Sequence, residues 1–208
     1  MGEFPAVVLK RGRERWIKGG HPWVYRAAVE ESPESVEPGC IVDVLDKGRR
    51  FVARGYYNPA SSIPVRVLTR DASQDVDQEF LACRIAEAYK QRQTWIDTKK
   101  TTAYRIVHGE NDYLPGLIVD RYADFWVIQI HTMGMDRLRE EIVRAIQKVA
   151  SPKGIFERSN LGAREQEGLE TKPVGVLAGE EPPRQVKILE NSASFLIDIQ
   201  EGQKTGFF

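Results

Sequence analysis

Residues 41–68 read IVDVLDKGRRFVARGYYNPASSIPVRVL, which is three apolar runs separated by two turn signals. The runs and the turns between them are residues 41–45, 46–48, 51–57, 58–62 and 63–68. Short runs of β-branched and aromatic residues joined by Gly, Asn and Pro are typical of hairpins in small all-β domains. With the apolar stretch Val7-Val8-Leu9 upstream, this pattern predicts a small N-terminal β-barrel.

A polar stretch at residues 71–75 follows the barrel and marks the expected domain boundary. Beyond it, apolar residues recur at helical spacing over residues 75–97. Asp75, with Gln78 three positions later, resembles the capping box of a helix N-terminus. We therefore expect one domain at residues 1–72 and a second at 73–208.

The second domain is predicted to be a mixed α+β unit. The expected strands are residues 105–107, 117–122, 125–130, 154–158, 186–190 and 195–199. A second helix is expected over residues 135–149, a long polar loop over 159–173, and a hairpin turn at Asn191-Ser192. The fold class is thus α+β, with a β-barrel first and a smaller mixed domain after it.

The composition is that of a globular protein. Of 208 residues, 41% are hydrophobic and 29% are charged, which argues against disorder along the whole chain. No run approaches the ~18 apolar residues of a membrane span, and Met1–Pro5 does not open a secretory signal. Cys40 and Cys83 match no zinc or redox spacing, so we expect buried, reduced thiols in a cytoplasmic protein.

Charge is unevenly distributed although the formal net charge is zero. Residues 1–70 contain 12 Lys and Arg against 8 Asp and Glu, so this part carries +4 and the remainder −4. A basic N-terminal third favours a polyanionic partner.

A cationic run in this basic third is interleaved with aromatic and imidazole side chains. The residues concerned are Lys10, Arg11, Arg13, Arg15, Lys18, His21, Trp23 and Tyr25, with Trp16 among them. Cations neutralise phosphates and aromatic rings stack on unpaired bases, so the run indicates an RNA-binding site. The alternative is a solvated loop whose aromatic residues fill the barrel core, and for Trp23 alone the core is favoured.

Two other groups of polar residues have competing interpretations. The cluster His108, Glu110, Asp112 and Asp120 could bind a metal or supply acid–base chemistry, and the first three could serve a small hydrolase. Asn and Asp are also ordinary turn residues, and the turn is favoured. Arg158 and Arg164 could contact phosphate or lie in a solvated loop. No phosphate loop, Gly-x-Gly-x-x-Gly or nucleophile elbow occurs in the chain, and no metal site is predicted.

Six motifs taken together resemble a known family. They are Leu9-Lys10-x-Gly12-Arg13, His21-Pro22-Trp23-Val24-Tyr25, Ala53-Arg54-Gly55-x-Tyr57-x-Pro59, the stretch from His108-Gly109-Glu110 to Asp120-Arg121-Tyr122, Glu157-Arg158-Ser159 and Gly202-Gln203-Lys204-Thr205-Gly206-Phe207. In this order they resemble the PUA-domain-containing, S-adenosylmethionine (SAM)-dependent methyltransferases that form 5-methylcytosine in 23S ribosomal RNA. Arg54, in the third motif, completes the set of candidate RNA-binding residues.

The resemblance implies three parts: an RNA-binding PUA domain, a central domain of strand-strand-helix-strand-strand type, and a Rossmann-like domain with the donor site and the catalytic cysteine. This chain stops where the third part is expected. The glycine-rich turn that binds the methyl donor and the Pro-Pro catalytic loop, both expected in the third part, are missing from this chain. Neither Cys40 nor Cys83 matches the position of the catalytic cysteine.

The resemblance therefore predicts an RNA-positioning portion that is inactive alone and binds no SAM, although the parent enzyme would use it. Lys204, Thr205 and Phe207 match a segment at the edge of the donor pocket. The alternative is a stand-alone RNA-binding or adaptor protein without enzyme activity, in which Phe207 and Phe208 are docked on the fold.

Overall fold

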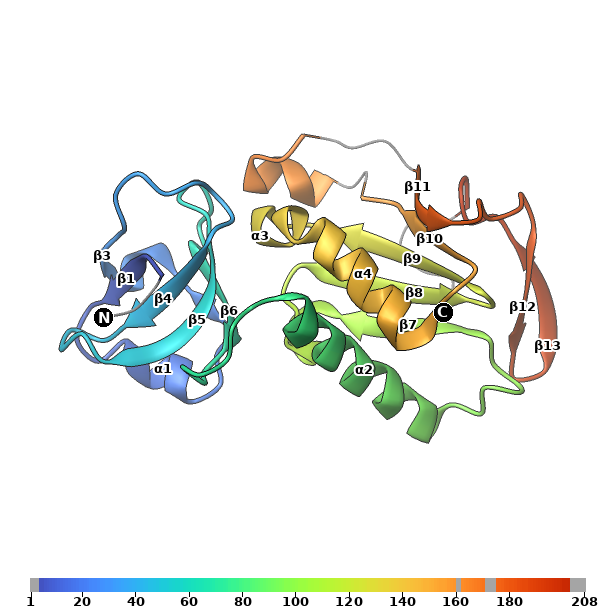
Figure 1. Ribbon diagram of the computed structural model, residues 1–208, viewed down its shortest axis with the longest axis horizontal. Helices are drawn as coiled ribbons and strands as arrows, with labels where there is room; N and C mark the ends of the chain where they lie inside the picture. The colour runs from blue at the N-terminus through green and yellow to red at the C-terminus, as the bar shows by residue number, and fades with distance from the viewer. Residues whose placement is uncertain (1–3, 160–161, 171–174, 203–208) are drawn as a thin grey trace.

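The computed structural model describes residues 4–159, 162–170 and 175–202 (Figure 1). Two sheets stand side by side, and the chain passes from the first to the second between residues 69 and 78. A two-stranded hairpin lies at the far end of the second half (Figure 1). None of the described helices is long and apolar enough to cross a lipid bilayer.

The first half is one six-stranded sheet with two short helical segments. Its elements are β1 (Ala6–Leu9), α1 (Glu14–Lys18), β2 (Trp23–Val24), the 3₁₀ turn η1 (Arg26–Ala28), β3 (Val29–Glu31), β4 (Ile41–Leu45), β5 (Phe51–Tyr57) and β6 (Val65–Thr69). The strand order is β2-β6-β5-β4-β1-β3, and only the β1–β4 pair is parallel. The expected barrel is therefore a curled sheet with β2 and β3 at its edges.

The second half contains the remaining elements. They are α2 (Gln78–Trp95), β7 (Ala103–His108), η2 (Gly109–Asp112), β8 (Leu117–Tyr122), β9 (Phe125–Ile130), α3 (Met133–Arg137), α4 (Arg139–Ala150), β10 (Gly154–Glu157), η3 (Gly162–Glu167), β11 (Gly175–Gly179), β12 (Val186–Glu190) and β13 (Ala193–Ile197). The sheet order is β11-β10-β9-β8-β7, with β9 and β10 parallel. The order strand-strand-helix-strand-strand occurs here as β8, β9, α3–α4, β10 and β11, preceded by α2 and β7.

Helices α2 and α4 cover one face of the five-stranded sheet (Figure 1). The core between them contains Leu81 and Ile85 of α2, Ile142 and Ile146 of α4, and Ile128 of β9. These side chains are fully buried because the apolar positions of each helix recur every three or four residues, on the face toward the sheet.

The structure corrects three local expectations. Helix α2 begins at Gln78, because the Asp77 carboxylate accepts a hydrogen bond from the Phe80 amide at 2.8 Å, and Asp75 is not the cap. The second predicted helix is broken at Leu138 into α3 and α4. Cys83 is exposed on α2 rather than buried, whereas Cys40 is half-buried.

Strand β5 belongs to both halves of the molecule. Successive side chains of a strand point to opposite faces, so Tyr57 packs in the core of the first sheet and Tyr56 in the core of the second half. The Tyr56 hydroxyl oxygen lies 2.9 Å from both the Pro115 carbonyl oxygen and the Thr132 hydroxyl. Gly134 makes room for the ring, since a Cβ there would lie 2.0 Å from it.

Replacement of Tyr56 by Phe is expected to destabilise the protein by about 1–3 kcal/mol, because two buried polar groups lose a partner. Urea unfolding measures the loss. Tyr25→Phe is the control, since Tyr25 is exposed. Equal losses in the two variants would contradict the assigned role of the Tyr56 hydroxyl.

His131 follows β9 and is half-buried, and its Nε2 is buried without a hydrogen-bond partner among the described residues. Burial lowers the pKa of His131 below its usual 6.5, and the positive charges of Arg164 and Arg105 lower it further, against Glu110. The unfolded chain therefore binds a proton that the folded chain resists, so stability falls as the pH drops below about 6.5.

We expect His131→Asn to flatten this pH dependence between pH 7.5 and 5. The measurement is the free energy of unfolding in urea at several pH values. Parallel curves for the wild type and the variant would show that His131 does not cause the loss.

Candidate nucleic-acid interface

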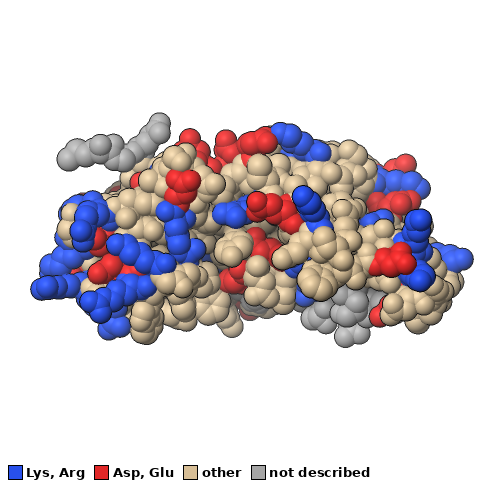
Figure 2. All heavy atoms as spheres, turned by 90° about the horizontal axis from the view of Figure 1, so that it is seen from below, with Lys and Arg blue, Asp and Glu red and all other residues tan. Residues whose placement is uncertain are grey.

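The predicted cationic run lies on the surface of the first half. Lys10, Arg11 and Arg13 occupy the turn after β1, and Arg15 and Lys18 lie on α1; all five are exposed. Ile17, a residue of α1, is buried in the core of the first half, and this contact leaves the charged residues of the short helix exposed. Figure 2 shows Lys and Arg side chains gathered at this end of the molecule.

The aromatic residues of the run form one cluster beside it. The ring of His21 has its centroid 6.3 Å from Trp16, 6.1 Å from Trp23 and 5.7 Å from Tyr25. Trp16 is 61% exposed and Tyr25 is 39% exposed, so two ring faces are open to solvent. Open aromatic faces next to cations are what single-stranded RNA requires.

Trp23 does not lie in the barrel core as favoured from the sequence. It is half-buried, and its Nε1 donates a hydrogen bond to Glu110 Oε1 at 2.8 Å. Glu110 belongs to η2 in the second half of the molecule. The aromatic cluster therefore meets η2, which joins two segments 87 residues apart in sequence.

Arg70 binds the backbone of the segment that carries the aromatic cluster. Its guanidinium donates to the carbonyl oxygens of Ile17, at 2.6 Å, and His21, at 2.9 Å. Burial lowers the pKa of Arg70, and the neighbouring Tyr113 partly counters this. Arg70 thus fixes α1 and the His21 turn relative to each other.

Arg54 is placed differently from the other candidate RNA-binding residues. It is buried, and its Nε donates to the Asp43 carboxylate at 2.8 Å. Its guanidinium also lies 4.3 Å from the centre of the Phe4 ring. Arg54 therefore stabilises the first sheet and is not part of the exposed cationic surface.

His108, Glu110 and Asp112 make hydrogen bonds within the fold. The Asp112 carboxylate accepts hydrogen bonds from Arg92 at 2.5 and 2.7 Å and from the His108 amide at 2.6 Å. Glu110 accepts a hydrogen bond from Trp23, so both carboxylates have partners within the fold, which agrees with the turn interpretation. Among the described residues, no group of three His, Cys, Asp or Glu side chains could hold a metal ion.

Arg164 makes buried contacts within the fold, which neither interpretation of the sequence predicted. Arg164 is fully buried in η3 and donates to the Ile130 carbonyl at 2.8 Å and to Asp136 at 3.0 Å. The expectation of a solvated loop is wrong for this residue. Arg158 donates to the Gly202 carbonyl at 2.9 Å. The candidate donor-pocket residues Lys204, Thr205 and Phe207, and Phe208, lie outside the described residues.

Asp112→Ala is expected to destabilise the protein by about 3 kcal/mol, because Arg92 loses its buried partner and the His108 amide its acceptor. The matched control is Asn111→Ala at the exposed neighbouring position. Urea unfolding compares the two. A hydrolytic role would instead require that Asp112→Ala leave stability unchanged.

A family model described as a PUA-like domain matches residues 7–70. The chain is 36% identical over 202 residues to ribosomal RNA large subunit methyltransferase I of Shigella boydii serotype 4, and 35% identical over 205 residues to the protein of that name in Klebsiella pneumoniae. These matches cover 97% and 99% of the chain but 51% of each relative. The chain thus spans about half the length of the curated relatives it matches.

Two solved structures share the fold. One is a Streptococcus mutans protein proposed to be a SAM-dependent methyltransferase, with a TM-score of 0.76 and 20% identity over 95% of this chain and 49% of that one. The other is a proposed methyltransferase in complex with SAH, with a TM-score of 0.80 and 20% identity over 98% of this chain and 50% of that one. The chain therefore contains a PUA-like domain and is similar, over nearly its full length, to part of large-subunit ribosomal RNA methyltransferases.

Proposed function

We propose that this chain recognises and positions RNA for a SAM-dependent ribosomal RNA methyltransferase that modifies carbon 5 of cytosine. Residues 1–72 would bind the RNA, and residues 73–208 would connect this domain to a Rossmann-like catalytic domain in the same protein. The observation that carries the proposal is the exposed cationic run beside the solvent-open aromatic cluster, within the residues that match a PUA-like domain.

The two kinds of side chain have separate tasks in this proposal. Lys10, Arg11, Arg13, Arg15 and Lys18 neutralise phosphates and release counterions, which supplies affinity. His21, Trp23 and Tyr25, with Trp16, offer rings to unpaired bases. Among the described residues, Arg11, Arg13, Arg15 and Lys18 form no ion pair, so their charges are available to RNA.

In this proposal, the chemical step is assigned to the half of the curated relatives that this chain does not match. SAM supplies the methyl group in the parent enzyme, and the family reaction begins with attack of a thiolate on cytosine C6. Cys40 does not suit this role, because burial raises the pKa of its thiol and disfavours the thiolate. We propose that this chain alone binds no SAM and catalyses no methylation, and that it acts on ribosomal RNA in the cytoplasm.

We expect Arg13→Ala/Arg15→Ala to weaken RNA binding about tenfold and to reduce the slope of log K against log salt by roughly 1.4, which is 0.7 per lost phosphate contact. Fluorescence anisotropy with a labelled 16-nucleotide single-stranded RNA and a labelled RNA hairpin, titrated at several salt concentrations, measures both quantities.

The matched control is Lys47→Ala/Arg49→Ala, which removes the same charge from the same half. These two side chains are exposed but already paired, with Glu30 at 3.0 Å and Glu31 at 2.6 Å. The control should leave the slope nearly unchanged. Equal effects of the two double variants, or no RNA binding by the wild type at low salt, would contradict the proposed function.

A further inference from the structure

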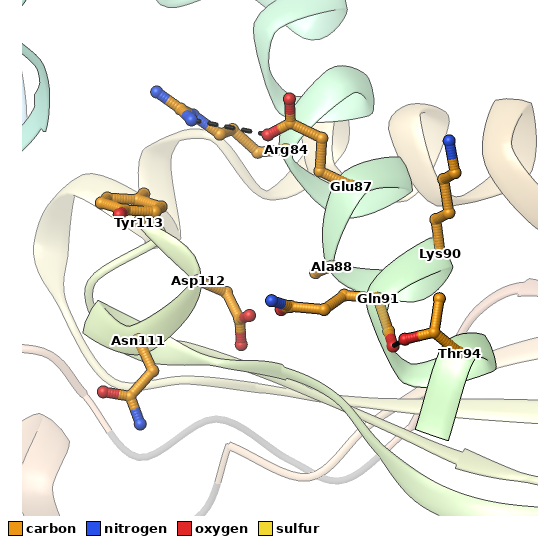
Figure 3. Close-up of a pocket in the computed structure, with 9 residues that line it drawn as sticks. All are labelled: Arg84, Glu87, Ala88, Lys90, Gln91, Thr94, Asn111, Asp112 and Tyr113. Atoms are coloured by element: carbon orange, nitrogen blue, oxygen red, sulfur yellow. Dashed lines mark hydrogen bonds and ion pairs between the residues drawn. The ribbon is translucent and has the colours of Figure 1, made fainter. Parts of the chain in front are cut away.

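A cavity of about 430 Å³ lies between α2 and η2, close to the aromatic cluster (Figure 3). One wall is α2, with Arg84, Ala88 and Gln91, and the opposite wall is η2 and the residue after it, with Asn111 and Tyr113. Ala88 is also part of the core of the second half, but Arg84, Gln91, Asn111 and Tyr113 belong neither to that core nor to the proposed phosphate contacts.

Tyr113 is the most unusual residue of the cavity. Its backbone has φ +58°, a left-handed conformation that disfavours a bulky side chain, and its ring is 56% exposed. The Arg84 guanidinium lies 5.1 Å from the ring centre and orients it. An ordered aromatic ring that is neither buried nor hydrogen-bonded to the fold is suited to stacking on a planar ligand.

Two carboxamides complete the lining. Gln91 reaches from α2 toward Asp112, and Asn111 lies on the wall below Tyr113 (Figure 3). Gln91 Oε1 accepts from Arg92 at 3.2 Å, and Asn111 Nδ2 lies 3.2 Å from His108 Nδ1. Within the described part of the chain, Gln91 Nε2 and Asn111 Oδ1 have no partner, so one donor and one acceptor remain for a ligand.

Three of the four charged side chains that line the cavity, Arg84, Glu87 and Asp112, are held in ion pairs. Arg84 pairs with Glu87 at 3.5 Å, and the Asp112 carboxylate is bound by Arg92. Lys90 also lines the cavity and has no ion pair among the described residues, so its charge can contact a phosphate next to a bound base. Between the paired charges, Tyr113 and the two carboxamides suit an uncharged planar group that has both donors and acceptors on its edge, which describes a nucleobase.

The cavity adjoins the proposed RNA surface through η2. Glu110 of η2 accepts the Trp23 hydrogen bond, and Asn111 and Asp112 follow it directly. A strand of RNA whose bases stack on the cluster can therefore place a neighbouring base over Tyr113.

We propose that this cavity binds one unstacked base of the RNA, with Tyr113 stacking on its face and the Gln91 and Asn111 carboxamides hydrogen-bonding its edge. The inference rests on the proposed function, since the RNA is held by the cationic run. It assigns the second half of the molecule a role in base recognition that is independent of phosphate binding.

The test compares the wild type with Tyr113→Ala, Tyr113→Phe and Gln91→Leu. The probes are labelled 16-nucleotide single-stranded RNAs of oligo(A), oligo(C) and oligo(U), measured by anisotropy at several salt concentrations. Tyr113→Ala should weaken binding roughly 5- to 100-fold, the loss of about one stacked base, with an unchanged salt slope. Tyr113→Phe should retain binding. Gln91→Leu should reduce the differences in affinity among the three RNAs.

Phe195→Ala is the matched control, because it removes an exposed aromatic ring from β13, at the opposite end of the molecule from the first sheet. Thermal unfolding by circular dichroism verifies that each variant folds. If Tyr113→Ala and Gln91→Leu bind all three RNAs like the wild type, the cavity proposal is overturned while the proposed function stands. If the wild type binds no RNA at low salt, both fail. A reduced salt slope in Tyr113→Ala would assign the cavity to phosphate instead.

Discussion

The buried carboxylate of Glu167 is the contact on which the arrangement of the two halves depends. Its oxygens accept hydrogen bonds from Ser61 at 2.8 Å, Arg66 at 2.9 Å and Asn58 at 3.1 Å, all in the first half. A buried charge without partners is strongly unfavourable, so Glu167 requires the first sheet to be in place. Tyr56 of the first sheet crosses the same junction, because its ring packs in the core of the second half and its hydroxyl lies 2.9 Å from Pro115 O and Thr132 Oγ1. Glu167 and Tyr56 together fix the relative position of the two halves.

This fixed junction explains how residues far apart in sequence form one surface. Trp23 belongs to the first sheet and Glu110 to the second half, yet their side chains are hydrogen-bonded. For the RNA binding that we propose, rigid positioning of both side chains would lower the conformational entropy lost on association. In the proposed function, the phosphate contacts and stacking rings of the first half and the base cavity of the second half then lie at fixed positions along one RNA strand.

Charge is used differently in the two halves. In the first half, Arg11, Arg13 and Arg15 point to solvent without ion pairs among the described residues. In the second half, Arg92 and Arg164 are turned inward to Asp112 and Asp136. The chain is neutral overall, but the exposed cationic side chains of the first half are grouped in the turn after β1 and on α1. A neutral protein can therefore present a locally cationic face to RNA.

The sequence by itself determined the elements that depend on local order. The strands at 41–45, 51–57 and 186–190 lie where the apolar runs predicted them, and β13 pairs with β12 as expected but begins two residues earlier, at Ala193. The cationic run is exposed as expected. Only the tertiary structure decided that Arg54 and Arg164 are buried and that Glu167 joins the halves. A charged residue is exposed unless a distant partner compensates its burial, and Glu167 lies 109 residues from Asn58. Such pairs arise from chain topology, which local sequence patterns do not contain.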